Sequence, residues 1–265
     1  MNFKRFIKLY FQNLSMELSS VTTYRVAFFL NSLSLIIGAI TGPLAVLFIY
    51  NVSPGFNGWT FPEMLVFLGT IQITFGLTHA LVLGFSWVTA DLIINGRFDT
   101  VLLNPVNTLG YMLSRVIDFD GFVQMITGLV ILIIGLFSSG YNPDFTNWLF
   151  FAFLVIDGFL LWFAFSLLIG SLCFKYERSD EWFTIIFNLA KFGDYPLSIY
   201  GSLLSFVFTF IIPLGLISYY PANFLLGKLT DIGLFFELTG LMLVITFLAV
   251  KLYSKSLKNY SSAGG

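Results

Sequence analysis

The feature that most constrains this chain is a set of long, continuous apolar runs. The run from Trp148 to Phe174 is interrupted by a single charged residue, Asp157. A helix of about 20 apolar residues crosses the hydrocarbon core of a bilayer, whereas a barrel strand would alternate over about ten residues. Only 10% of the chain is charged, compared with about a quarter in soluble domains. The sequence therefore predicts an all-α integral membrane protein.

Five such runs are evident, and none of them has the polar face of a soluble helix. They predict membrane-spanning helices at residues 26–50, 64–88, 116–137, 148–174 and 232–250. Together with their connections they form one transmembrane domain that covers residues 1–265.

Residues 1–22 have a different pattern. Apolar residues recur at helical spacing from Phe3 to Leu18, while polar residues such as Lys8 fall mostly on the opposite side. This pattern predicts an amphipathic helix in the membrane interface, rather than a helix packed on a soluble domain. The polar residues also do not fit a cleaved signal peptide, so we expect this segment to persist in the mature protein.

The positively charged residues indicate the topology. Of the 13 Lys and Arg residues, 11 are Lys4, Arg5, Lys8, Arg25, Arg97, Arg115, Lys175, Arg178, Lys251, Lys255 and Lys258. The positive-inside rule places all these groups in the cytoplasm. The connections 51–60 and 138–147 contain neither Lys nor Arg and are expected outside. Because both termini are then cytoplasmic at the cell membrane, the number of spans must be even, and six are predicted.

The sixth span must come from residues 181–231. The simplest solution is a span at 181–200 that passes through a break at Gly193–Pro196, followed by a re-entrant helical hairpin at 201–230 around Pro213. The rival solution makes residues 197–216 the span and 181–191 a cytoplasmic interfacial helix. Re-entrant backbone requires surrounding protein or a water-filled cavity, and a substrate pathway is one such cavity.

Candidate pathway residues are the polar groups within the apolar runs. Asp157 lies near the centre of a predicted span, where a charge costs about 3 kcal/mol. It is either part of a substrate or proton site or a neutral acid in an interhelical hydrogen bond. His79 is interpreted as a hydrogen-bonded packing residue or a titrating one, and Glu237 and Pro213 complete the set. One histidine and one cysteine cannot form a His/Cys metal cluster, although carboxylate sites stay open.

Two further groups have structural interpretations. Arg115 and Asp118 are three residues apart near the start of a predicted span, so we expect them to pair on one helical face, with Asp120 nearby. Four-residue spacing of small side chains predicts close helix packing at Gly76, Ala80 and Gly84, and at Gly38 and Gly42.

Two stretches carry a family resemblance. The connection from Asn95 to Val106 reads Asn-Gly-Arg-Phe-Asp-Thr-Val-Leu-Leu-Asn-Pro-Val. The later stretch contains Tyr195-Pro196, Pro213 and Tyr220-Pro221-Ala222. With the amphipathic start and six predicted spans, these motifs resemble the permease subunits of type-2 ABC exporters over nearly the whole chain.

The resemblance implies a division of labour. Two permease subunits, identical or paralogous, would form the pathway in the lipid membrane, and cytoplasmic ATPase subunits would bind ATP and Mg. This chain would bind no cofactor itself, and its one Gly-Lys pair lacks the pattern of a phosphate-binding loop. Nucleic acid is not an expected partner.

The resemblance also implies a coupling segment at residues 89–110, which would dock on the ATPase together with the N-terminal helix. Gly96 would permit the turn, Phe98 would anchor in an apolar groove of the partner, and Arg97 and Asp99 would pair with its charges. Pro105 closes the motif. The alternative interpretation is a solvated loop.

The expected function is therefore transport of a hydrophobic or amphipathic substrate, such as a drug, lipid or glycan. The alternative is a secondary transporter or channel that depends on intramembrane acids such as Asp157 and Glu237. A membrane-embedded enzyme is the least favoured class, because a nucleophile and a base would have to lie within reach of each other.

Overall fold

The structure is a computed structural model that describes residues 3–176 and 179–260. Within these ranges it consists of helices and connections, without a strand. The long helices are α1 (Phe3–Thr23), α2 (Arg25–Val52), α3 (Phe61–Leu81), α4 (Gly84–Ile94), α7 (Phe119–Ser139), α8 (Phe145–Cys173) and α12 (Ile232–Lys258). Arg178 and residues 1–2 of the predicted interfacial segment lie outside the described ranges.

Five helical units have the length and composition to cross a membrane. They are α2, the α3–α4 unit, α7, α8 and α12, and they match the five apolar runs found in the sequence. Their starts have local causes. Thr60 and Glu63 form a capping box at α3, and Asp144 and Asn147 form another at α8.

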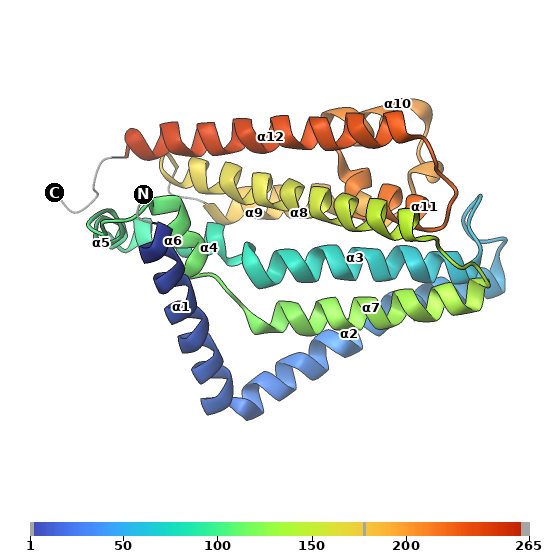
Figure 1. Ribbon diagram of the computed structural model, residues 1–265, viewed down its shortest axis with the longest axis horizontal. Coiled ribbons are helices and arrows are strands. Elements are labelled where there is room, and N and C mark those ends of the chain that lie inside the picture. Colours follow the sequence, from blue (N-terminus) through green and yellow to red (C-terminus); the bar gives the residue numbers. More distant parts are fainter. Residues whose placement is uncertain (1–2, 177–178, 261–265) are drawn as a thin grey trace.

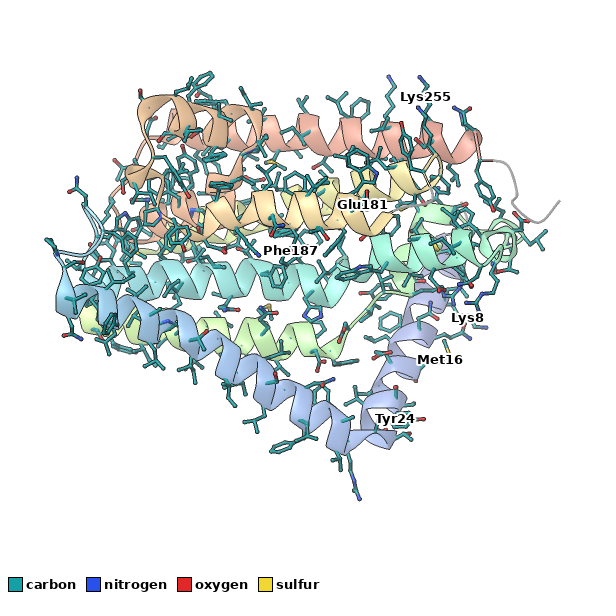
Figure 2. The ribbon with its side chains drawn as sticks, turned by 180° about the vertical axis from the view of Figure 1, so that it is seen from behind. Lys8, Met16, Tyr24, Glu181, Phe187 and Lys255 are labelled. Carbon is teal, nitrogen blue, oxygen red and sulfur yellow. The ribbon has the colours of Figure 1, made fainter. Side chains whose placement is uncertain are left out.

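The spanning units α3, α7, α8 and α12 run roughly parallel or antiparallel, α2 is inclined to them, and α1 runs at a steep angle to the bundle at one of its ends (Figure 1). Asn13 on α1 donates a hydrogen bond to Ser114 Oγ over 2.8 Å, which attaches α1 to α6 (Thr108–Ser114). Met16 of α1 and Tyr24, which lies between α1 and α2, are each more than half exposed (Figure 2). The N-terminal end of α1 and the C-terminal end of α12 lie at the same end of the bundle (Figure 1).

The closest helix pair is α3 with α7, and glycines make the approach possible. A Cβ atom at Gly128 of α7 would lie 2.7 Å from Ile73 N and 2.9 Å from Gly69 O of α3. The glycines with such close backbone contacts are Gly69, Gly76, Gly121, Gly128 and Gly135. The predicted packing role of Gly76 is thus confirmed. Gly38 is different, because a Cβ there would have no neighbour within 4 Å.

The predicted pairing of Arg115 with Asp118 is wrong because residues 115–118 are not helical. α7 begins at Phe119, three residues later than predicted for this span. The Asp118 carboxylate caps α7 by accepting a hydrogen bond from Asp120 N over 2.9 Å, and the Asp118 N–H donates to Ala80 O over 3.0 Å. The Arg115 guanidinium instead lies 5.7 Å from the centre of the Tyr111 ring.

Residues 179–231 follow an irregular path on one side of α8. Their helical pieces are α9 (Ser179–Ala190), η1 (Lys191–Asp194), η2 (Leu197–Ile199), α10 (Ser202–Phe206), η3 (Val207–Ile211), η4 (Leu214–Ile217) and α11 (Tyr219–Leu225). The predicted break at Gly193–Pro196 coincides with the end of η1. The single helix of the rival solution does not form, because residues 200–201 and 212–213 interrupt it.

The backbone of η4 and α11 is enclosed by protein, whereas α10 contains no buried residue. Leu214 and Leu216 of η4 are completely buried, and a Cβ at Gly158 of α8 would lie 2.6 Å from Leu216 O. Ser218 Oγ donates to Gly193 O over 2.7 Å, which joins the two breaks of the segment. Non-helical backbone at membrane depth is tolerated only under such cover.

The end of the bundle opposite α1 is fastened by Lys228 in the loop before α12. Lys228 Nζ lies 2.8 Å from Glu63 Oε2, donates to Gly58 O over 2.8 Å, and lies 4.4 Å from the centre of the Trp59 ring. Both partners of the ion pair are largely shielded from solvent, so their attraction is screened less than at an open surface.

We therefore expect Lys228→Met to lower the free energy of unfolding by about 1–3 kcal/mol. The measurement is thermal unfolding of the detergent-purified protein by circular dichroism. Lys255→Met is the control, because Lys255 projects from the exposed face of α12 (Figure 2). Equal melting temperatures for the two variants would show that the Lys228 contacts contribute no stability.

Candidate functional site

The predicted coupling segment forms a compact turn next to α6. Gly96 has a φ of 63°, a left-handed conformation that suits glycine, and lies between α4 and α5 (Phe98–Leu102). Arg97 pairs with Asp91 of the same chain, with an Nη2–Oδ2 distance of 3.1 Å. Both side chains are more than half exposed, so this ion pair contributes little to stability.

Phe98, which the resemblance implied as an anchor in a partner's groove, lies inside this chain instead of on its surface. The Phe98 side chain is fully buried within the chain. Its ring centre lies 5.1 Å from that of Phe174, which ends α8, and 5.2 Å from that of Tyr260, which follows α12. Phe98 therefore joins the turn to the ends of two long helices.

The residues exposed at this turn are others. Leu103, directly after α5, is 84% exposed, and Leu102 and Ile94 are also exposed. Pro105 is exposed, and Asp99 is partly buried. The family resemblance indicates the segment, and the exposed fraction of each residue shows which of its apolar side chains face outward.

His79 is part of a polar row between α3 and α7. Its Nε2 lies 3.4 Å from Asp118 Oδ2, and its Nδ1 lies 3.4 Å from Gln124 Oε1. Gln124 Nε2 in turn donates to Gln72 Oε1 over 2.8 Å. The structure thus brings His79 together with Asp118, a residue that the sequence analysis had placed in a separate cluster.

Carboxylates gather where α1 and α2 meet the start of α7. A hollow of about 150 Å³ there is lined by Glu17, Asn31, Asp118 and Asp120, among others. Burial raises the pKa of the Glu17 carboxyl above its ordinary value, and the charges of Asp118 and Asp120 raise it further. Protonation of Glu17 would therefore relieve repulsion at this junction.

Asp157 is buried, 3% exposed, and accepts a hydrogen bond from Thr239 Oγ1 over 2.7 Å. This bond links α8 to α12 and supports the structural interpretation of Asp157. Glu237 lies on the exposed face of α12, and Pro213 is buried between η3 and η4. These three candidate pathway residues are therefore not gathered into one site with His79.

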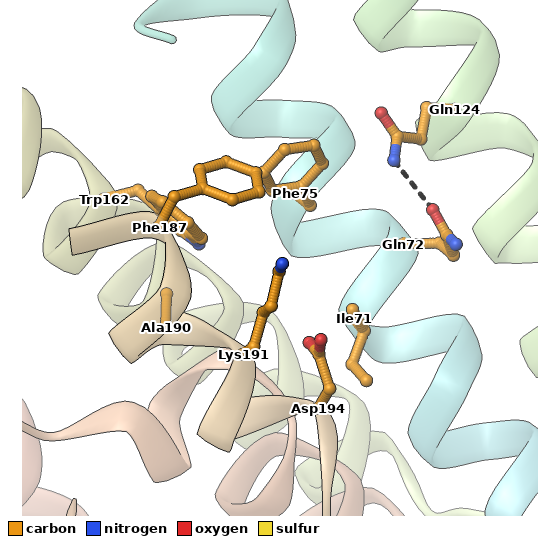
Figure 3. Close-up of a pocket in the computed structure, with 9 residues that line it drawn as sticks. All are labelled: Ile71, Gln72, Phe75, Gln124, Trp162, Phe187, Ala190, Lys191 and Asp194. Atoms are coloured by element: carbon orange, nitrogen blue, oxygen red, sulfur yellow. Dashed lines mark hydrogen bonds between the residues drawn. The ribbon is translucent and has the colours of Figure 1, made fainter. Parts of the chain in front are cut away.

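A hollow that the sequence analysis missed lies between α3, α8 and α9 (Figure 3). It has a volume of about 190 Å³ and is lined by Ile71, Gln72, Phe75, Gln124, Trp162, Phe187, Ala190, Lys191 and Asp194. Lys191 and Asp194 both extend into it from η1. The available signal was the presence of two charged residues, three positions apart, within the predicted span 181–200.

The structure thus offers polar and charged side chains inside a helical bundle. No group of three or more His, Cys, Asp or Glu side chains that could hold a metal occurs within residues 3–176 and 179–260. Gln72 and Gln124 belong both to the polar row from Asp118 and to the hollow. Polar groups therefore extend from the carboxylate junction into the middle of the bundle.

This architecture is that of a multi-pass helical membrane protein. A family model described as "ABC-2 family transporter protein" matches residues 18–264. The chain belongs to this family, as the sequence resemblance predicted, and is a membrane component of ABC transport. Comparison with curated proteins gave no match.

Proposed function

We propose that this chain is the permease subunit of an ABC exporter that moves a hydrophobic or amphipathic substrate outward across the cell membrane. Two permease subunits, identical or paralogous, form the pathway, and separate cytoplasmic ATPase subunits bind ATP and Mg. Membership of the ABC-2 transporter family supports this proposal.

The proposed topology has six crossings. They are α2, the α3–α4 unit, α7, α8, the broken segment 181–200 and α12, with both termini in the cytoplasm. Residues 201–230 enter the membrane from outside as a hairpin, and α1 lies in the cytoplasmic interface. Support comes from the shared location of the ends of α1 and α12, and from the steep angle between α1 and the bundle (Figure 1).

The observation that carries the proposal is the exposed apolar tip of the segment 89–110. Leu102 and Leu103 face away from the protein at the end of the bundle where α1 also lies. A soluble partner can cover these side chains and bury their apolar surface. Arg97 and Asp91 flank the tip and provide polar contacts at its rim.

In this proposal, ATP binding draws the two ATPases together and displaces the tip. Because Phe98 packs against Phe174 and Tyr260, the displacement reaches the cytoplasmic ends of α8 and α12. ATP can shift the permease between conformations only if its ATPase contacts differ between them. The exposed Leu103 would contact the moving ATPase, and the buried Phe98 would transmit the displacement to α8 and α12.

The test is Leu103→Glu in the full-length chain. A buried leucine contributes about 2 kcal/mol, so we expect the variant to recover at least about tenfold less ATPase partner. The measurement is purification in mild detergent, with mass spectrometry of copurifying chains and an assay of ATP hydrolysis. A partner with a phosphate-binding loop must be present for the unmodified chain.

Tyr176→Glu is the matched control. Tyr176 is an exposed apolar residue just beyond α8 and lies outside the segment 89–110. It should retain the partner. Equal recovery with Leu103→Glu and the unmodified chain would refute docking through the tip, and the absence of any ATPase would refute the proposed function.

A further inference from the structure

Lys191 and Asp194 place two opposite charges in the hollow beside the middle of α3 (Figure 3). Lys191 Nζ donates to Asn188 Oδ1 over 3.0 Å. In the described parts of the chain, Lys191 and Asp194 do not form an ion pair with each other. Both side chains belong to exposed residues of the chain, so the head group of an amphipathic ligand can reach them.

Trp162 supplies a donor that lacks an acceptor. Its side chain is 6% exposed and lines the hollow, and its Nε1–H has no hydrogen-bond partner within the described residues. A buried donor without an acceptor costs about 1–3 kcal/mol, so a ligand that provides one is favoured. Phe75 and Phe187 flank the indole, with ring centres 5.4 Å and 5.5 Å from it.

The hollow continues along α2 into a second one of about 330 Å³. The two hollows share Ile71, Gln72 and Asp194. The walls of the second are mostly small or apolar, and its lining includes Gly38, Ala39, Gly42, Ala45, Val46, Ile49, Met64 and Leu68. Gly38, which was expected to pack tightly on another helix, instead leaves room here, whereas a Cβ at Gly42 would lie 3.8 Å from Leu68 Cδ1. A charged cavity thus opens into an apolar slot.

We propose that the joined hollows bind a zwitterionic amphiphile of the phosphatidylethanolamine type. Its ammonium group pairs with Asp194, its phosphate accepts hydrogen bonds from Lys191 and the Trp162 indole, and an acyl chain follows α2. An anionic head group would be repelled by the Asp194 carboxylate, and a cationic head group would be repelled by the Lys191 ammonium group. This inference rests on the proposed function, for which it names the class of substrate.

The experiment is native mass spectrometry of the purified full-length chain in detergent. The probes are phosphatidylethanolamine and phosphatidylglycerol with identical acyl chains. We expect preferential binding of phosphatidylethanolamine, and a loss of about tenfold in its affinity in both Lys191→Gln and Asp194→Asn. Trp162→Phe removes the donor but keeps an aromatic ring, and should weaken both lipids equally.

The two charge variants have opposite expected effects on phosphatidylglycerol. Lys191→Gln should weaken its binding, whereas Asp194→Asn should strengthen it by removing repulsion. Lys255→Gln is the control and should match the unmodified chain, as should the circular dichroism of every variant. Equal binding of both lipids, or phosphatidylethanolamine binding that neither charge variant weakens, would overturn the proposal.

This experiment uses the chain without an ATPase. Lipid preference without any copurifying ATPase would leave the binding site standing and refute the permease function. Copurification of an ATPase without any lipid preference would support the permease function and refute the proposed lipid site.

Discussion

Replacing Gly128 with valine is expected to prevent stable packing of α7 against α3. The first added atom would lie 2.7 Å from both Gln72 Cβ and Ile73 N, and the backbone of α3 cannot yield as a flexible side chain can. The helices must separate, and the close contacts at Gly69 are lost with them. We expect a loss of about 3 kcal/mol or more in the free energy of unfolding.

The measurement is thermal unfolding in detergent, where this loss corresponds to a decrease of about 10 °C in the melting temperature. Gly240→Val is the matched control, because a Cβ at Gly240 of α12 meets no atom within 4 Å. If the two variants melt at the same temperature, the α3–α7 glycines are not needed for packing. Failure to purify Gly128→Val while Gly240→Val purifies normally would agree with the expectation.

The five continuous spans could be predicted because the bilayer itself sets their length and composition. The run 148–174 became α8 at Phe145–Cys173, and the run 26–50 became α2 at Arg25–Val52. Capping accounts for the extra residues at the start of α8, where Asp144 and Asn147 act outside the apolar run. Hydropathy finds the membrane core of a helix, and local hydrogen bonds determine its ends.

The path of residues 179–231 was harder to predict, because hydropathy shows which residues are apolar but not how an interrupted backbone runs. The break at Gly193–Pro196 could be predicted from glycine and proline, which weaken or interrupt helices. The burial of Leu214 and Leu216 depends instead on Gly158 of α8, more than 50 residues earlier. Such enclosure is a tertiary property that local sequence does not contain.

Small-residue spacing shows that a helix face is smooth but not what covers it. Gly76 lies against α7, as the pattern predicted, whereas Gly38 borders a hollow. The glycines of α7, Gly121, Gly128 and Gly135, recur every seven residues and could have been noticed in the sequence. Their partner helix could not, since helix pairing arises only when the bundle forms.

The same limit applies to the polar residues. Asp157 was recognised as costly, but its donor Thr239 lies on a helix far along the chain. His79 and Asp118 were interpreted separately, and their contact depends on the close packing of α3 with α7. Lys191 and Asp194 line one hollow with Trp162 of α8 and Phe75 of α3, which are far from them in the sequence.

Phe98→Ala is expected to disrupt both the fold of the coupling segment and its connection to the bundle. Phe98 is fully buried, and it packs on Phe174 and Tyr260. Truncating a buried phenylalanine to alanine costs about 3–5 kcal/mol. We therefore expect a lower melting temperature and loss of substrate-stimulated ATP hydrolysis in the assembled transporter.

Phe98→Leu and Leu103→Ala separate the two roles within the same turn. Phe98→Leu keeps most of the apolar volume, so it should fold and bind the ATPase but couple less well to α8 and α12. Leu103→Ala removes exposed surface, so it should melt like the unmodified chain and retain less ATPase. If Phe98→Ala instead melts normally and only loses its partner, Phe98 itself contacts the ATPase, and the turn must open when the partner docks.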